Sequence, residues 1–133
     1  LGDDLKRTTF RCGDRTLDNM LEECRTKFSD RNPLVRREAL ERLWDAWERL
    51  KSLADPRDKK QSIKIILDAV AAEPTLRSRL ETEAVELTAI GNSHLIRHSE
   101  VNQVAVIDVD HVDYLFHRLF AMIQLMLRRK GNA

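Results

Sequence analysis

Apolar residues recur at steps of three and four along most of this sequence, and this spacing limits the fold more than any other feature. The clearest stretch follows Asn32 and Pro33, where a capping side chain precedes a proline at the first helical position. One stripe of this stretch then carries six apolar side chains: Leu40, Leu43, Trp44, Trp47, Leu50 and Leu53. The pattern predicts a long amphipathic helix over 33–53 with one buried face.

Four further stretches carry the same spacing. They predict helices over 16–28, 62–72 and 76–96, and a last helix that Asp108 or Asp110 caps and that ends near Arg128. Thr75 is the expected cap of the helix over 76–96. The chain has only 4 glycines and 3 prolines, too few for the many turns of a β fold. We therefore predict an all-α fold: a compact bundle of about five helices, with residues 1–12 as a short irregular arm and a small extended segment within 101–107.

Several residues indicate how this bundle packs. Gly91 lies inside a predicted helix, where glycine costs about 1 kcal/mol relative to alanine, so we expect close helix packing or a site that needs room there. Trp44 and Trp47 are three residues apart and are expected to anchor the core. Cys12 and Cys24 lack a CxxC spacing, which favours buried reduced thiols over a disulfide or a structural zinc site.

Length, charge and hydropathy indicate how many domains the chain has and where it is expected to act. The 133 residues suit a single domain over 1–133, and the formal charge of +1 gives no strong general attraction to nucleic acid. No apolar run approaches the roughly 18 residues of a membrane span, and residues 1–9 hold no apolar signal-peptide core, so we predict a cytoplasmic protein that does not contact membranes. Because the first residue is Leu1, we also expect the chain to be part of a longer protein with additional domains.

The densest group of reactive side chains lies in the segment IGNSHLIRHSE, residues 90–100. It contains five polar side chains within nine positions: Asn92, His94, Arg97, His98 and Glu100. Phosphate-binding glycine loops and the common hydrolase motifs GxxxxGK[ST], HExxH and GxSxG do not occur in the sequence.

Three interpretations of this segment remain open. His94 and His98 are four residues apart and could hold zinc if Glu100, His111 or His117 supplied a third ligand. Alternatively, the polar side chains only hydrogen-bond a helix end and the loop that follows.

The third interpretation is phosphodiester chemistry on RNA. A histidine can take the proton of a 2′-hydroxyl group while an arginine holds the phosphate, and no metal is needed. Arg97 and His98 are adjacent, so on a regular helix they point about 100° apart. Their cooperation requires the helix to end there or a partner chain to contribute.

Three segments, LERLWDAWERLKSL, IGNSHLIRHSE and HVDYLFHRLFAMIQLML, resemble the HEPN-type helical domains of bacterial abortive-infection and antiphage proteins, over about residues 35–128. The resemblance implies a compact helical bundle that is often dimeric. It also implies that active members are metal-independent endoribonucleases, which carry an arginine, a polar residue and a later histidine. Arg97 and His98 match the start of that motif, whereas the positions of the later histidine hold Asn102, Gln103 and Val104.

The resemblance implies Arg97 and His98 as catalytic residues, and Glu100 is expected to act with His98 in a variant of that site. Asn92, His94 and Asn102 are the expected substrate-binding residues, and no metal or cofactor is expected. The expected function is that of an antiphage endoribonuclease domain, or of a degenerate relative that still binds RNA or a nucleotide. The alternative is a dimerisation or docking module of a larger signalling or defence protein. The expected partners are RNA and a second copy of the chain. Four side chains of the last helix are expected to contact the second copy: Tyr114, Phe116, Phe120 and Met122.

Overall fold

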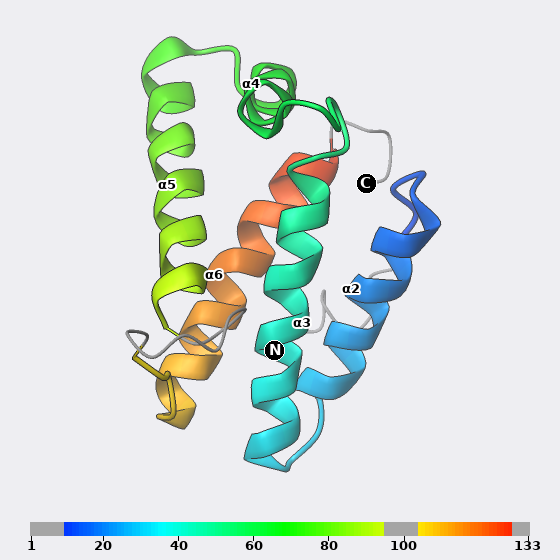
Figure 1. The fold of residues 1–133 in the computed structure, drawn as a ribbon, viewed down its shortest axis with the longest axis vertical. Coiled ribbons are helices and arrows are strands. Elements are labelled where there is room, and N and C mark those ends of the chain that lie inside the picture. Colours follow the sequence, from blue (N-terminus) through cyan, green and yellow to red (C-terminus); the bar gives the residue numbers. More distant parts are fainter. Residues whose placement is uncertain (1–9, 95–103, 129–133) are drawn as a thin grey trace.

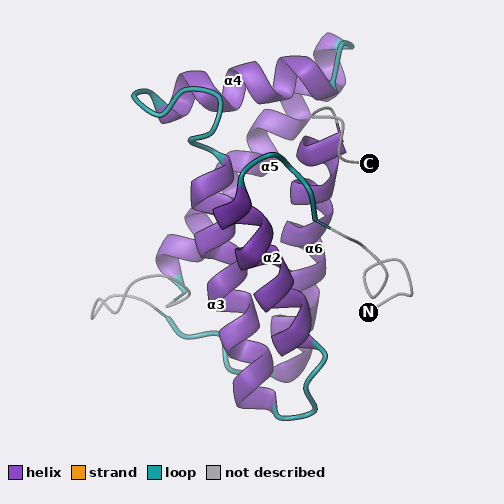
Figure 2. Ribbon diagram, turned by 90° about the vertical axis from the view of Figure 1, so that its right-hand side faces the viewer, coloured by secondary structure: helices purple, strands orange, loops and turns teal. Residues whose placement is uncertain are grey.

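Five helices and no strand are present in residues 10–94 and 104–128, the residues that the computed structural model of this protein describes. The helices are α2 (Arg15–Phe28), α3 (Pro33–Leu50), α4 (Lys59–Val70), α5 (Pro74–Ser93) and α6 (Val109–Arg128). Four of them run roughly along the long axis, and α4 lies across one end of the bundle (Figures 1 and 2). The predicted all-α bundle is confirmed. Of the predicted N-terminal arm, residues 10–12 are described and are not helical.

Side-chain caps begin these helices, and two of the predicted starts were wrong. Asn32 caps α3 as predicted, since its side chain accepts the backbone N–H of Leu34 at 3.0 Å. However, α4 begins at Lys59, because the Asp58 carboxylate accepts the N–H of Gln61 at 3.1 Å. The cap of α5 is Glu73 rather than Thr75, with Pro74 at the first helical position.

The ends of the helices also differ from the prediction. Helix α3 ends at Leu50 and α5 at Ser93, each three residues earlier than expected, while α4 ends at Val70. At the end of α5 the carbonyl of Ser93 accepts the backbone N–H of Val104 at 2.9 Å, so the chain returns to this point after residues 95–103. Residues 104–107 form no strand, and residues 101–103 of the predicted extended segment lie outside the described residues.

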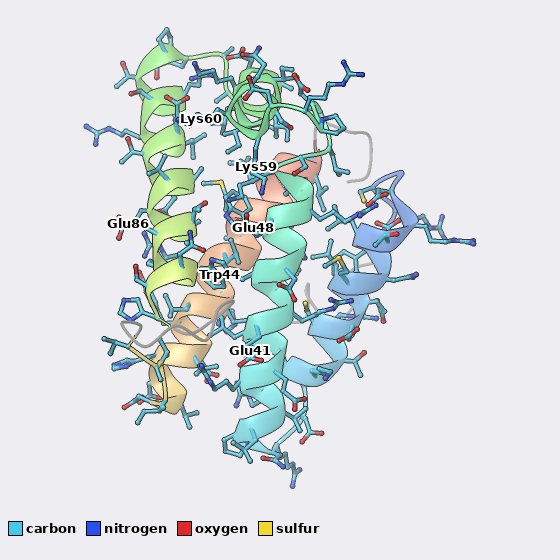
Figure 3. The ribbon with its side chains drawn as sticks, viewed as in Figure 1. Glu41, Trp44, Glu48, Lys59, Lys60 and Glu86 are labelled. Carbon is cyan, nitrogen blue, oxygen red and sulfur yellow. The ribbon has the colours of Figure 1, made fainter. Side chains whose placement is uncertain are left out.

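The core forms where α3 packs against α2 and α6. Trp44 and Trp47 are fully buried, as predicted, and their indole N–H groups donate to Leu87 O at 2.8 Å and to Thr88 Oγ1 at 3.1 Å on α5. Figure 3 shows Trp44 between α3 and α5. A Cβ atom built on Gly91 would overlap the Trp44 ring, which confirms the close packing that this glycine predicts.

The aromatic residues of α6 also belong to this core. Phe116 stacks on Phe28 of α2 with ring centroids 3.8 Å apart, and it lies parallel to Phe120. Phe116 is 0% exposed, and Phe120 and Met122 are each 5% exposed. The prediction that these three side chains cover a second copy of the chain was therefore wrong, because the chain buries them itself.

The two cysteines are free and buried, as predicted. Burial is the main reason that the pKa of Cys12 rises to about 11 and that of Cys24 to about 12. Both thiols therefore stay protonated near neutral pH. In the described part of the chain, no helix has the length and apolar content that crossing a bilayer requires.

Candidate functional site

Two of the six predicted site residues lie within the described residues. Asn92 is in the last turn of α5, and His94 is the residue that ends this helix. The other four, Arg97, His98, Glu100 and Asn102, fall in 95–103 and so lie outside the described residues.

His94 and Val104, which flank residues 95–103, are held together at the end of α5. The Val104 N–H donates to Ser93 O at 2.9 Å, and the Val104 carbonyl lies 3.0 Å from Nδ1 of His94. Both flanking residues line the same cleft. The peptide chain therefore enters and leaves the segment 95–103 beside one surface of the molecule.

This cleft is lined by residues from the end of α5 and the start of α6. In Figure 1 these two helix ends lie at the end of the bundle opposite α4. The volume of the cleft is about 480 Å³, within the range of small-molecule sites in proteins. Its walls are mostly apolar, and four of its side chains carry polar groups. The lining residues are Ile90, His94, Val104, Ala105, Val106, Ile107, Asp108, His111, Tyr114 and Leu115.

The ring of His94 is oriented by its hydrogen bond. A carbonyl oxygen can only accept, so Nδ1 of His94 carries the proton in the bond to Val104 O. In the neutral ring this leaves the Nε2 lone pair as an acceptor for a ligand proton. His94 is thus suited to bind a hydroxyl or an amino group in the cleft.

Two guanidinium groups hold the opposite wall of the cleft against α3. Arg37 donates to the carbonyl of Val106, and Arg36 forms an ion pair with Asp113 at 2.7 Å. The Arg36 guanidinium also lies over the ring of Phe28, 4.6 Å from its centroid. The segment that contains Val106 and the start of α6 up to Asp113 are therefore attached to the core of the bundle.

The first turns of α6 contribute Asp108, His111 and Tyr114. The Asp108 carboxylate accepts the backbone N–H groups of Asp110 at 2.8 Å and His111 at 3.4 Å, so it caps the helix rather than acting as a free base. His111 is exposed, and Tyr114 is 61% exposed. His111 and Tyr114 are three residues apart on a helix, a spacing that puts two side chains on one face.

The sequence interpretation placed Tyr114 on a dimer surface and did not predict that it lines a cleft with His94. The spacing of His111 and Tyr114 was a signal that these two side chains share a face. It could not show that this face meets the end of α5, because that contact depends on the packing of both helices on α3.

The described residues provide no set of ligands for the zinc site that the sequence suggested around His94 and His98. Within 10–94 and 104–128, no group of three His, Cys, Asp or Glu side chains is placed to hold a metal ion. His117, one of the proposed third ligands, donates from Nδ1 to the carbonyl of Asp113 at 2.7 Å and contacts the Phe28 ring edge-on. Its role is in the packing of α6 against α2.

A second cleft, of about 420 Å³, lies between α4 and α5. It is lined by Lys60, Ile63, Lys64, Glu81, Thr82 and Val85. Lys60 is labelled in Figure 3, near the end of the bundle that α4 covers. Its two lysines could attract an anion, but none of the residues predicted from the sequence lies in this cleft.

No protein-family model matches this chain, and neither a curated protein nor a solved structure matches it. The resemblance to HEPN-type domains therefore stays a prediction.

Proposed function

We propose that this chain is a HEPN-like domain of a bacterial antiphage protein that binds RNA beside the cleft between α5 and α6 and cleaves it without a metal ion. The observation that supports this most is the position of His94. Its ring is oriented by Val104 O, its Nε2 atom is left to accept, and it lies where the segment containing Arg97 and His98 begins.

In the proposed reaction, His98 takes the proton of a 2′-hydroxyl group, and the freed oxygen attacks the adjacent phosphorus. The bond from phosphorus to the 5′-oxygen breaks, and the 5′-oxygen leaves as a hydroxyl group after it takes a proton from water. The products are a 2′,3′-cyclic phosphate and a 5′-hydroxyl end. Arg97 stabilises the charge on the phosphate oxygens, and Glu100 pairs with the imidazolium of His98. Asn92, His94 and Asn102 hold the RNA around the reacting phosphate.

The test is an RNA cleavage assay in EDTA with wild type, Arg97→Ala and His98→Ala. Arg57→Ala and His117→Ala serve as controls, because both residues lie outside the cleft lining. We expect the wild type and both controls to produce 2′,3′-cyclic phosphate ends and the two site variants to lose at least 100-fold in rate, roughly what one acid–base group contributes. Equal cleavage by His98→Ala, with unchanged helicity, would contradict the assigned role.

A docking or dimerisation module is the second candidate function. It is favoured by five large apolar side chains that are exposed near the starts of α3 and α6: Leu34, Val104, Ile107, Val109 and Tyr114. An apolar surface of this kind is typical of a protein contact. Sedimentation across a wide concentration range tests this function: Ile107→Asp should abolish any self-association, and a wild-type protein that stays monomeric at every concentration counts against a homodimer.

A further inference from the structure

The walls of the cleft between α5 and α6 suit an uncharged ligand group better than a phosphate. Among its described lining residues none is Lys or Arg, and Asp108 brings a negative charge. A phosphate group placed there would find no Lys or Arg among the described lining residues to pair with, and it would meet the carboxylate. The part of an RNA strand that fits these walls is therefore a base.

The cleft also carries an aromatic side chain that is largely exposed. Tyr114 is 61% exposed at the edge of walls formed by Val104, Ile107 and Leu115. Exposed aromatic rings bind nucleic acid by stacking on bases, and only bases that have left a duplex can reach them. The polar groups of a base edge would meet Nε2 of His94 and the imidazole of His111, which line the same cleft.

We propose that the cleft holds one unpaired base, stacked on Tyr114, with His94 and His111 at its hydrogen-bonding edge. This assigns Tyr114 as the residue that selects single-stranded over double-stranded RNA. The inference rests on the proposed function, in which RNA binds beside this cleft. The bound base would place its neighbouring phosphate outside the cleft.

Tyr114 is the only tyrosine in the chain, so 3-fluorotyrosine labelling gives one fluorine NMR signal that reports on this position. The probe is a ten-nucleotide 2′-O-methyl RNA, which has no free 2′-hydroxyl group and cannot be cleaved. We expect the signal to shift with the single strand and to stay in place with the duplex of the same sequence.

Variants separate stacking from other contacts. Tyr114→Ala should weaken binding of the single strand by about tenfold, whereas Tyr114→Phe keeps the ring and should bind within about twofold of wild type. Leu76→Ala is the matched control, because Leu76 is also exposed but lies at the opposite end of α5.

Three results would overturn the inference: no fluorine shift with the single strand, an equal shift with the duplex, or a shift that appears without RNA as the protein concentration rises. The last result would assign Tyr114 to self-association instead. The proposed cleavage is measured separately on ordinary RNA. A fluorine shift without cleavage would leave base binding standing and remove the nuclease, whereas cleavage with an unmoved signal would remove the base site alone.

Discussion

Gly91 faces the indole ring of Trp44, where α5 approaches α3 closely. The same ring donates its N–H to the carbonyl of Leu87, one turn earlier on α5. Trp44 thus fills the space that a side chain at position 91 would need. This contact keeps the end of α5, and with it His94, at a fixed place relative to the core.

The substitution Gly91→Ala should therefore reverse the usual effect of alanine in a helix. Alanine is favoured over glycine by about 1 kcal/mol in a helix interior, but here the added methyl group overlaps Trp44. We expect a net loss of about 1–3 kcal/mol in the free energy of unfolding, the usual range for an overpacked core. Urea unfolding measures it, with the exposed Glu86→Ala on the same helix as control. An increase in stability for Gly91→Ala would contradict the packing described here.

Glu48 and Lys51 form a buried ion pair at the end of α3. The ammonium of Lys51, whose side chain is 3% exposed, lies 2.5 Å from Glu48 Oε2 and donates to Thr88 Oγ1 on α5 at 2.7 Å. Glu48 also pairs with Lys59 of α4 at 3.0 Å, and the two are labelled in Figure 3. Burial alone would raise the pKa of Glu48, but the hydrogen bonds and charges of Lys51 and Lys59 outweigh burial and lower it.

The substitution Glu48→Gln should cost about 3 kcal/mol of unfolding free energy at neutral pH, because it leaves the buried Lys51 charge without its counter-ion. The pKa of Glu48 is lower in the folded state, so its contribution is complete above its ordinary pKa of 4.5 and disappears as the pH falls through the folded value. Urea unfolding of both proteins between pH 7 and pH 3 checks this. Glu38→Gln, which removes an exposed pair with Lys27, is the control and should change stability by less than about 1 kcal/mol. A gap between wild type and Glu48→Gln that stays constant down to pH 3 would contradict the lowered pKa.

At the scale of elements, the start of α6 is what brings His111 and Tyr114 to the cleft. Asp108 caps this start with hydrogen bonds to two backbone N–H groups. Arg36 attaches the second turn to α3 through its ion pair with Asp113. The cleft therefore depends on the start of α6, which is stabilised by the Asp108 cap and by the ion pair between Arg36 and Asp113.

Asp108→Ala should cost about 1 kcal/mol of stability and loosen the first turn of α6, whereas Asp108→Asn keeps a good capping side chain and should lose much less. Amide hydrogen exchange of residues 110–113 measures the local effect, and thermal unfolding measures the global one. Equal exchange rates in the two variants would show that the cap does not order this end.

The helices could be predicted from the sequence where one apolar stripe of the helix faces the core, as in α2 and α3. The start of α4 was missed because Lys59 and Lys60 follow the Asp58 cap and carry no apolar side chain to extend the stripe. On α6 the pattern could not distinguish burial within the chain from burial by a second copy. Phe116 meets Phe28 of α2, a contact between residues 88 positions apart that periodicity does not encode.

At the scale of the whole molecule, the sequence predicted one end of the candidate site and not the other. His94 was singled out because polar residues cluster where α5 ends, whereas Asn92 of the same cluster is not among the residues that line the cleft. His111 and Tyr114 meet His94 only because α5 and α6 both pack on the core, so the cleft is a product of tertiary structure. The cleft between α4 and α5 differs from this one in chemistry, since it carries Lys60 and Lys64.

That difference allows a direct test of where RNA binds. A single-stranded RNA containing 4-thiouridine is crosslinked to the protein by light, and the attached peptides are identified by mass spectrometry. Our account predicts crosslinks within residues 90–115, which contain the proposed catalytic residues and the lining of the cleft between α5 and α6. Crosslinks confined to residues 60–64 and 81–85 would mean that the lysines of the other cleft attract the RNA, and they would contradict the proposed site.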